Sequence, residues 1–114
     1  MKLTIVDVFA ESLYAGNQLA VVEDCAHLDD ATMQDIAREM NFSETTFVVS
    51  QSEGRARVRI FTPTEELPFA GHPTLCAAWV LGSDRADYTL ELDAGDVPTQ
   101  RRAREGEPSV RPPA

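Results

Sequence analysis

The most constraining feature of the sequence is an uninterrupted apolar run over residues 75–81, which includes Trp79. Pro73 stands two residues before this run and suits the first turn of a helix, where its missing N–H costs nothing. Gly82 follows the run and favours a helix end. Because a helix without a polar face is usually buried on all sides, we predict that this helix lies at the centre of the fold with Trp79 in the core.

The rest of the chain predicts strands around that helix. Asp29 or Asp30 is suited to cap an outer helix that runs to about Met40, with apolar residues at positions 33, 36, 37 and 40 on one face. Runs of alternating or β-branched residues, separated by turns, indicate strands over residues 3–9, 18–22, 45–49, 56–62 and 88–92. We therefore expect an α+β fold, in which a mostly antiparallel sheet wraps around a buried central helix.

Composition excludes several classes of partner. With 114 residues the chain has the length of one domain, and its net charge of −9 disfavours binding to nucleic acid. No apolar run approaches the roughly 20 residues of a membrane span, and no signal-like segment opens the chain, so we expect a cytoplasmic protein. Cys25 and Cys76 have no neighbouring ligands at metal spacing, and we expect neither a structural metal nor a disulfide.

Glu44 is the first candidate for chemistry. It follows Ser43 and opens a strand that is otherwise apolar and β-branched. A partly desolvated carboxyl group at such a place is suited to act as a general base, which contributes about 10²–10⁴ in rate. The alternative interpretation is an ordinary exposed carboxylate at a strand edge.

Gly71, His72, Pro73 and Thr74 lead into the predicted central helix. Free N–H groups at a helix N-terminus attract anions, and glycine lets a ligand approach the backbone closely. We therefore expect a carboxylate-bearing substrate here, the alternative being a simple turn that His72 caps. Asn17 either serves only its Gly-Asn turn or also touches the substrate.

Three stretches together resemble one known family. They are Tyr14-Ala15-Gly16-Asn17-Gln18-Leu19-Ala20-Val21-Val22 after Val8-Phe9, then Asn41-Phe42-Ser43-Glu44-Thr45-Thr46-Phe47-Val48, and then Phe61-Thr62-Pro63-Thr64-Glu65-Glu66-Leu67-Pro68-Phe69-Ala70-Gly71-His72-Pro73-Thr74-Leu75. In this order they are similar to the phenazine-biosynthesis-type (PhzF-like) isomerases, a branch of the diaminopimelate-epimerase fold.

The resemblance implies an acid/base isomerase without a cofactor, built from two similar lobes that enclose a small carboxylate substrate. It implies that Glu44 is the general acid/base, and that Gly71 and His72 hold and polarise the substrate, so that Glu44 and His72 lie near one another. Related amino-acid epimerases carry a catalytic cysteine at or beside the position of Gly71, and this chain has none there.

The resemblance covers one lobe. We assign residues 1–97 to an N-terminal lobe and residues 98–114 to a polar, Pro- and Arg-rich tail, which is a ragged strand, a linker, the start of an absent second lobe, or a disordered segment. The chain is then a truncated product, one half of a split enzyme, or a lobe that pairs with its own copy. We expect weak or no activity from the lobe alone, and self-association as a two-fold dimer or binding to a second-lobe partner. The competing hypothesis is a non-catalytic binding or oligomerising module.

Overall fold

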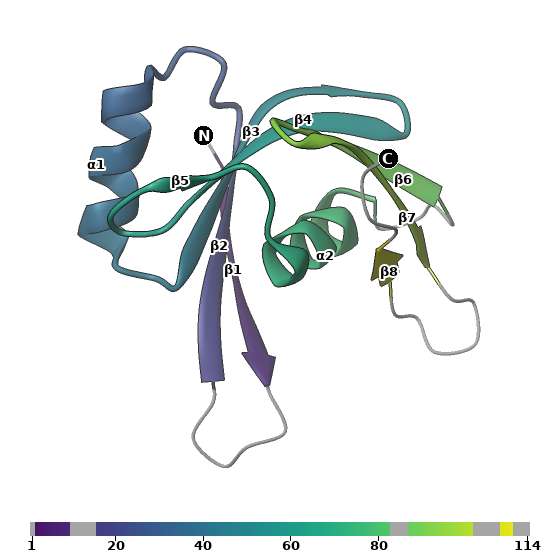
Figure 1. The fold of residues 1–114 in the computed structure, drawn as a ribbon, viewed down its shortest axis with the longest axis horizontal. Coiled ribbons are helices and arrows are strands. Elements are labelled where there is room, and N and C mark those ends of the chain that lie inside the picture. The colour runs from purple at the N-terminus through teal and green to yellow at the C-terminus, as the bar shows by residue number, and fades with distance from the viewer. Residues whose placement is uncertain (1, 10–15, 83–86, 102–107, 111–114) are drawn as a thin grey trace.

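The computed structural model describes residues 2–9, 16–82, 87–101 and 108–110. These residues form eight strands and two helices (Figure 1). In chain order the elements are β1 (Lys2–Phe9), β2 (Gly16–Glu23), α1 (Asp30–Met40), β3 (Glu44–Ser52), β4 (Arg55–Phe61), β5 (Glu66–Leu67), α2 (Gly71–Leu81), β6 (Asp87–Leu92), β7 (Gly95–Arg101) and β8 (Pro108–Val110).

The strands form one mixed sheet in the order β1-β2-β3-β4-β6-β7-β8, and β5 pairs with β4 beside this path. Two neighbouring pairs are parallel, β2 with β3 and β4 with β6, and the other described pairs are antiparallel. In Figure 1 the sheet curves around α2, from β1 and β2 across β3 and β4 to β6, β7 and β8. The predicted α+β class with a mostly antiparallel sheet around a central helix is confirmed.

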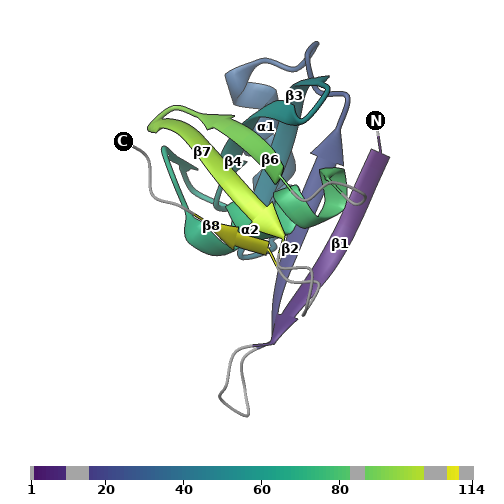
Figure 2. The same ribbon diagram turned by 90° about the vertical axis from the view of Figure 1, so that its right-hand side faces the viewer.

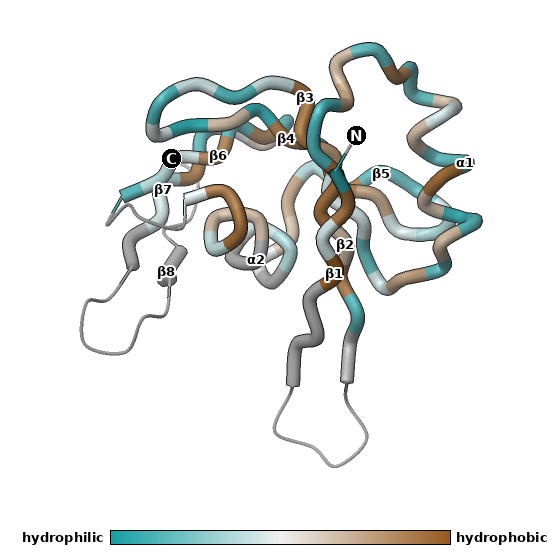
Figure 3. Tube along the Cα trace, turned by 180° about the vertical axis from the view of Figure 1, so that it is seen from behind, coloured by the Kyte–Doolittle hydropathy of each residue, from teal (hydrophilic) through white to brown (hydrophobic). Residues whose placement is uncertain are grey.

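The two helices lie on opposite sides of the sheet, and each covers its own apolar core (Figure 1). The α1-side core contains Val22, Cys25, Met33, Ala37, Phe47 and Phe61. The α2-side core is larger and contains Val21, Val48, Ala56, Val58, Ile60, Ala77, Ala78, Tyr88, Leu90, Leu92 and Val97. Strands between the helices supply alternate residues to the two cores, as the pleat of a strand requires. In Figure 3 the far end of the β3–β4 hairpin, which neither helix covers, is hydrophilic.

Helix α1 follows its sequence signals closely. Asp29 is the N-cap, and its Oδ1 accepts a hydrogen bond of 2.8 Å from the N–H of Thr32. Asn41 ends the helix in the left-handed conformation (φ 53°), which asparagine adopts more readily than most residues. Met33 and Ala37 lie on the buried face, as the apolar spacing predicts.

Helix α2 begins at Gly71, and Gly82 follows its last residue. It packs against β2, β3, β6 and β8 (Figure 2), and Ala77 and Ala78 are buried. The prediction that Trp79 lies in the core is wrong, because 44% of its surface is exposed. Ala77 and Ala78 belong to the α2-side core, whereas Trp79, the next residue, is partly exposed.

Sequence patterns did not reveal β5, and for the region of β7 and β8 they offered a strand only as one of several alternatives. Strand β5 has only two residues, too few for any periodicity. Strand β7 contains Pro98, which pairs with Thr89 of β6, and it continues to Arg101. None of the helices among the described residues is long and apolar enough to cross a membrane.

Candidate active site

Glu44 is the first residue of β3 and is half-buried. It pairs with Leu19 of the parallel neighbour β2, and the N–H of Ser43 donates to the carbonyl of Gln18 at 3.2 Å. Val48 belongs to the α2-side core, and residues two apart on a strand point to the same face. Glu44 therefore lies on the side of the sheet that faces α2.

The N-terminus of α2 is open to a ligand. Its N-cap, Ala70, has an extended backbone and gives no side-chain cap, and no acidic residue stands in the first turn. Gly71 is exposed, and a Cβ atom placed there would meet nothing within 4 Å. Because Pro73 has no N–H and the N–H of Thr74 donates to Ala70 at 3.2 Å, the N–H groups that an anion would meet here are those of Gly71 and His72.

Thr74 and Pro73 form the inner part of this turn. Both are buried, and the Thr74 hydroxyl donates to the Ala70 carbonyl at 2.6 Å. The Thr74 side chain thus closes the first turn of α2 from within.

The other two predicted site residues are described by their backbone only. His72 is the second residue of α2, and Asn17 lies in β2 opposite Val8 of β1. Asn17 stands two residues before Leu19, the partner of Glu44, so Asn17 and Glu44 occupy neighbouring strands near the same end. The side chains of His72 and Asn17 lie outside the described part of the structure, and so does any contact between His72 and Glu44.

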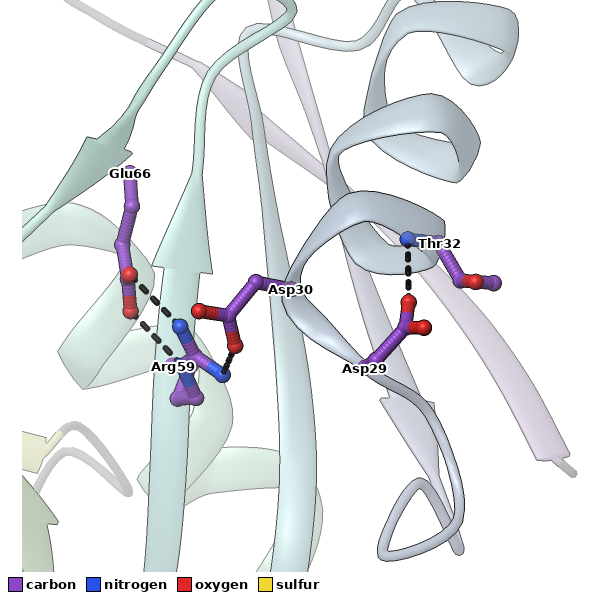
Figure 4. A network of polar contacts seen from close by, with 5 residues as sticks. All are labelled: Asp29, Asp30, Thr32, Arg59 and Glu66. Carbon is purple, nitrogen blue, oxygen red and sulfur yellow. Dashed lines mark hydrogen bonds and ion pairs between the residues drawn. The ribbon is translucent and has the colours of Figure 1, made fainter.

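A network of charged side chains holds the chain just before α2 (Figure 4). Arg59 of β4 donates two hydrogen bonds to Glu66 of β5, at 2.8 and 2.7 Å, and a third to Asp30 of α1 at 2.6 Å. The guanidinium group also lies 5.4 Å from the centre of the Phe61 ring. The hydrogen bond with Glu66, followed by that with Asp30, raises the pKa of Arg59 above its ordinary value.

Sequence reasoning missed Arg59. The available signal was the series of arginines at positions 55, 57 and 59 on an otherwise apolar strand. Their burial differs only in the folded structure. Arg55 and Arg57 are exposed, whereas the Arg59 side chain is 22% exposed. Its partner Glu66 is partly buried and accepts both of the hydrogen bonds that hold β5 to this side chain.

No group of three or more His, Cys, Asp or Glu side chains that could hold a metal ion occurs among the residues that the structure describes. The candidate site combines a half-buried carboxylate on the α2-facing side of β3 with a helix N-terminus that has no side-chain cap. Such a pair is suited to proton transfer on a small anionic substrate.

Comparison with known proteins connects this geometry to a family. The model of the PhzC-PhzF family, described as phenazine biosynthesis-like protein, matches residues 6–111. A trans-2,3-dihydro-3-hydroxyanthranilate isomerase from Pseudomonas aeruginosa is 46% identical over 108 residues, which cover 92% of this chain and 39% of that protein. The protein of the same name from Pseudomonas fluorescens is 50% identical over 90 residues, or 78% of this chain and 32% of that protein.

Solved structures agree with the fold. A PhzF-family phenazine biosynthesis protein from Bacillus anthracis superposes with a TM-score of 0.77 at 33% identity, over 96% of this chain and 40% of that one. A hydroxyproline epimerase from Agrobacterium vitis, 15% identical with a TM-score of 0.60, shares the fold over 83% of this chain and 38% of its own. The chain spans about two fifths of the length of the relatives that it matches.

Proposed function

The chain belongs to the PhzC-PhzF family of phenazine biosynthesis-like proteins, and from that premise we propose that it forms the first lobe of an isomerase or epimerase that moves a proton on a small carboxylate substrate without a cofactor. The observation that carries the proposal is the position of Glu44 on the α2-facing side of β3, within the segment that matches the family. The N-terminus of α2, without acidic residues in its first turn, supports an anionic substrate.

In the proposed reaction the substrate carboxylate binds to the N–H groups of Gly71 and His72. Glu44 removes a proton from a substrate carbon and returns a proton at another position, so the reaction is an isomerisation with no net change in composition. His72 and Asn17 are proposed to contact and polarise the substrate. The Thr74 hydroxyl is bonded to Ala70, so we assign Thr74, with Pro73, the role of shaping the helix N-terminus.

The reaction is proposed to need a second lobe. Electrostatic contacts to an anion gain strength when water is excluded, and one lobe leaves Glu44 and the first turn of α2 open on the side away from the sheet. Since the relatives are about two and a half times as long as this chain, the second lobe comes from further sequence of the same protein or from a partner.

The test joins this chain to the second-lobe portion of the Pseudomonas aeruginosa relative and follows deuterium uptake from D₂O into trans-2,3-dihydro-3-hydroxyanthranilate by mass spectrometry. Replacement of the base, Glu44→Gln, should lower the exchange rate by about 10²–10⁴. The matched control is Glu39→Gln, which removes an exposed carboxylate from α1 and should leave the rate unchanged. Equal rates in the parent chimera and the Glu44→Gln variant would show that Glu44 is not the base, and a folded parent without exchange would count against the isomerase.

A second candidate function is a non-catalytic module that binds a partner or its own copy. The exposure of Leu3, Ile5 and Trp79, at 47%, 50% and 44%, favours it, because exposed large apolar side chains mark interaction sites when they gather on a surface. Sedimentation of the 114-residue chain beside the same exchange assay separates the two candidates. Self-association without exchange supports the module, and an active monomer would contradict both this candidate and the requirement for a second lobe.

A further inference from the structure

Arg59 joins three elements through one guanidinium group (Figure 4). Its Nε and Nη2 donate to the two carboxylate oxygens of Glu66, and its Nη1 donates to Asp30 Oδ1. The side chains of Arg59 and Glu66 are only 22% and 26% exposed, so solvent weakens their contact less than that of a surface pair. A planar bidentate pair fixes orientation as well as distance, and Glu66 is thereby held in one position against β4.

Glu66 belongs to a short stretch of chain, residues 65–70, that leads directly into α2. Carbonyl groups in this stretch accept hydrogen bonds from three N–H groups outside it: Glu65 from Thr62 at 2.8 Å, Pro68 from Ala94 at 3.3 Å, and Ala70 from Thr74 at 3.2 Å. The two bonds nearest to α2 are long for N–H···O bonds. Strand β5 is also paired with β4 at Leu67 and Glu66, and the short, charge-assisted contact of Glu66 with Arg59 adds a side-chain restraint to this pairing.

We propose that Arg59 is a positioning residue, which holds residues 65–70 through Glu66 and so fixes the direction of the first turn of α2. This inference rests on the proposed function, in which that turn receives the substrate carboxylate. The path is short, since only three residues lie between Leu67, the end of β5, and Gly71. A displaced β5 therefore displaces the N–H groups of Gly71 and His72.

The competing explanation is that Arg59 only stabilises the fold by connecting α1 to the sheet. The two partners of Arg59 separate these explanations, because Asp30 belongs to α1 and Glu66 leads to α2. Each can lose its charge without a change of shape, as Asp30→Asn and Glu66→Gln. The two variants are matched, because each one weakens one carboxylate contact with the guanidinium group of Arg59.

The first measurement is amide hydrogen exchange by NMR on the 114-residue chain, with the global free energy of unfolding from urea titration. The reporters are the N–H groups of Thr62, Thr74 and Ala94, which donate to residues 65–70. Glu66→Gln should accelerate their exchange about tenfold, whereas Asp30→Asn should change it less than about twofold. Equal acceleration in both variants, or none in Glu66→Gln, overturns the positioning role.

The second measurement is the affinity of the two-lobe chimera for 3-hydroxyanthranilate, the aromatic counterpart of the substrate named for the Pseudomonas relatives, from the chemical shifts of the Gly71 and His72 amides. Glu66→Gln should weaken binding by about tenfold and Asp30→Asn should not. Arg59→Lys, which keeps the charge and loses the bidentate contact, should lie between Glu66→Gln and the parent in both measurements. Parent-like behaviour of Arg59→Lys overturns the proposal. A parent chimera that does not bind the probe counts against the carboxylate site of the proposed function, while the hydrogen-exchange comparison on the 114-residue chain still decides the role of Arg59.

Discussion

Thr45 carries a buried hydroxyl group, and its removal should change the free energy of unfolding by an amount that can be predicted. The residue is 1% exposed, and its Oγ1 has no hydrogen-bond partner in the part of the chain that the structure describes. Thr45 lies in the middle of the sheet, opposite Ala20 of β2 and Phe61 of β4. A hydroxyl group buried without a partner costs about 1–3 kcal/mol.

The substitution Thr45→Val replaces this hydroxyl with a methyl group of similar size and keeps the β-branched shape that favours a strand. It removes the desolvation cost without opening a cavity. We expect the free energy of unfolding to rise by about 1 kcal/mol, the lower end of that range, because the methyl group must still be accommodated. For a chain of this length such a change raises Tm by about 4 °C.

Thr99 supplies the matched control. It is 3% exposed, but its hydroxyl donates to the Tyr88 carbonyl at 2.6 Å. Thr99→Val should therefore lower the free energy of unfolding by about 1 kcal/mol. Urea titration followed by circular dichroism gives both values, provided that the m-value is unchanged. If Thr45→Val destabilises the chain as much as Thr99→Val does, the Thr45 hydroxyl has a partner and the reasoning is wrong.

Three further predictions concern acid, base and the single tryptophan. The hydrogen bond from Thr32 lowers the pKa of Asp29 below 3.8, so its stabilising effect should be lost as the pH falls through that lowered pKa, and Asp29→Asn should remove this part of the acid dependence in unfolding titrations. Burial raises the pKa of the Cys25 thiol above 9.0, so the folded state should lose stability as the pH rises above 9, less steeply in Cys25→Ala. Trp79 is 44% exposed, and acrylamide should quench its fluorescence in the folded chain; emission typical of a buried indole would contradict its placement.

The sequence predicted those parts of the fold that are determined by residues close together in the chain. Helix α1 could be placed to within a residue because Asp29 caps it, Asn41 ends it, and its apolar residues recur with the helical period. Glu44 was recognised as the start of a strand because the β-branched and apolar residues begin directly after it. The family match over residues 6–111 supports the motifs from which the resemblance was inferred.

The parts that sequence did not predict have distant causes. Strand β7 contains Pro98, a residue that disfavours central strands, and it forms because β6 provides a partner from Gly95 to Gln100. Arg59 meets Glu66 and Asp30 across 7 and 29 positions of sequence, and no periodicity relates them. The faces of β3 could be assigned only after α1 and α2 had been placed on opposite sides of it.

The prediction that Trp79 is buried was wrong for this chain, and the proposed second lobe offers an explanation. A helix whose last seven residues are all apolar should be covered on every side, yet Trp79 of α2 is 44% exposed. An all-apolar helix is usually buried on every side, and α2 would fit this rule if a further element covered Trp79. The relatives, which are about two and a half times as long, have the additional sequence to provide it. We therefore expect the fluorescence of Trp79 to shift toward that of a buried indole when the proposed second lobe binds, and an unchanged spectrum in the two-lobe chimera would contradict this explanation of its exposure.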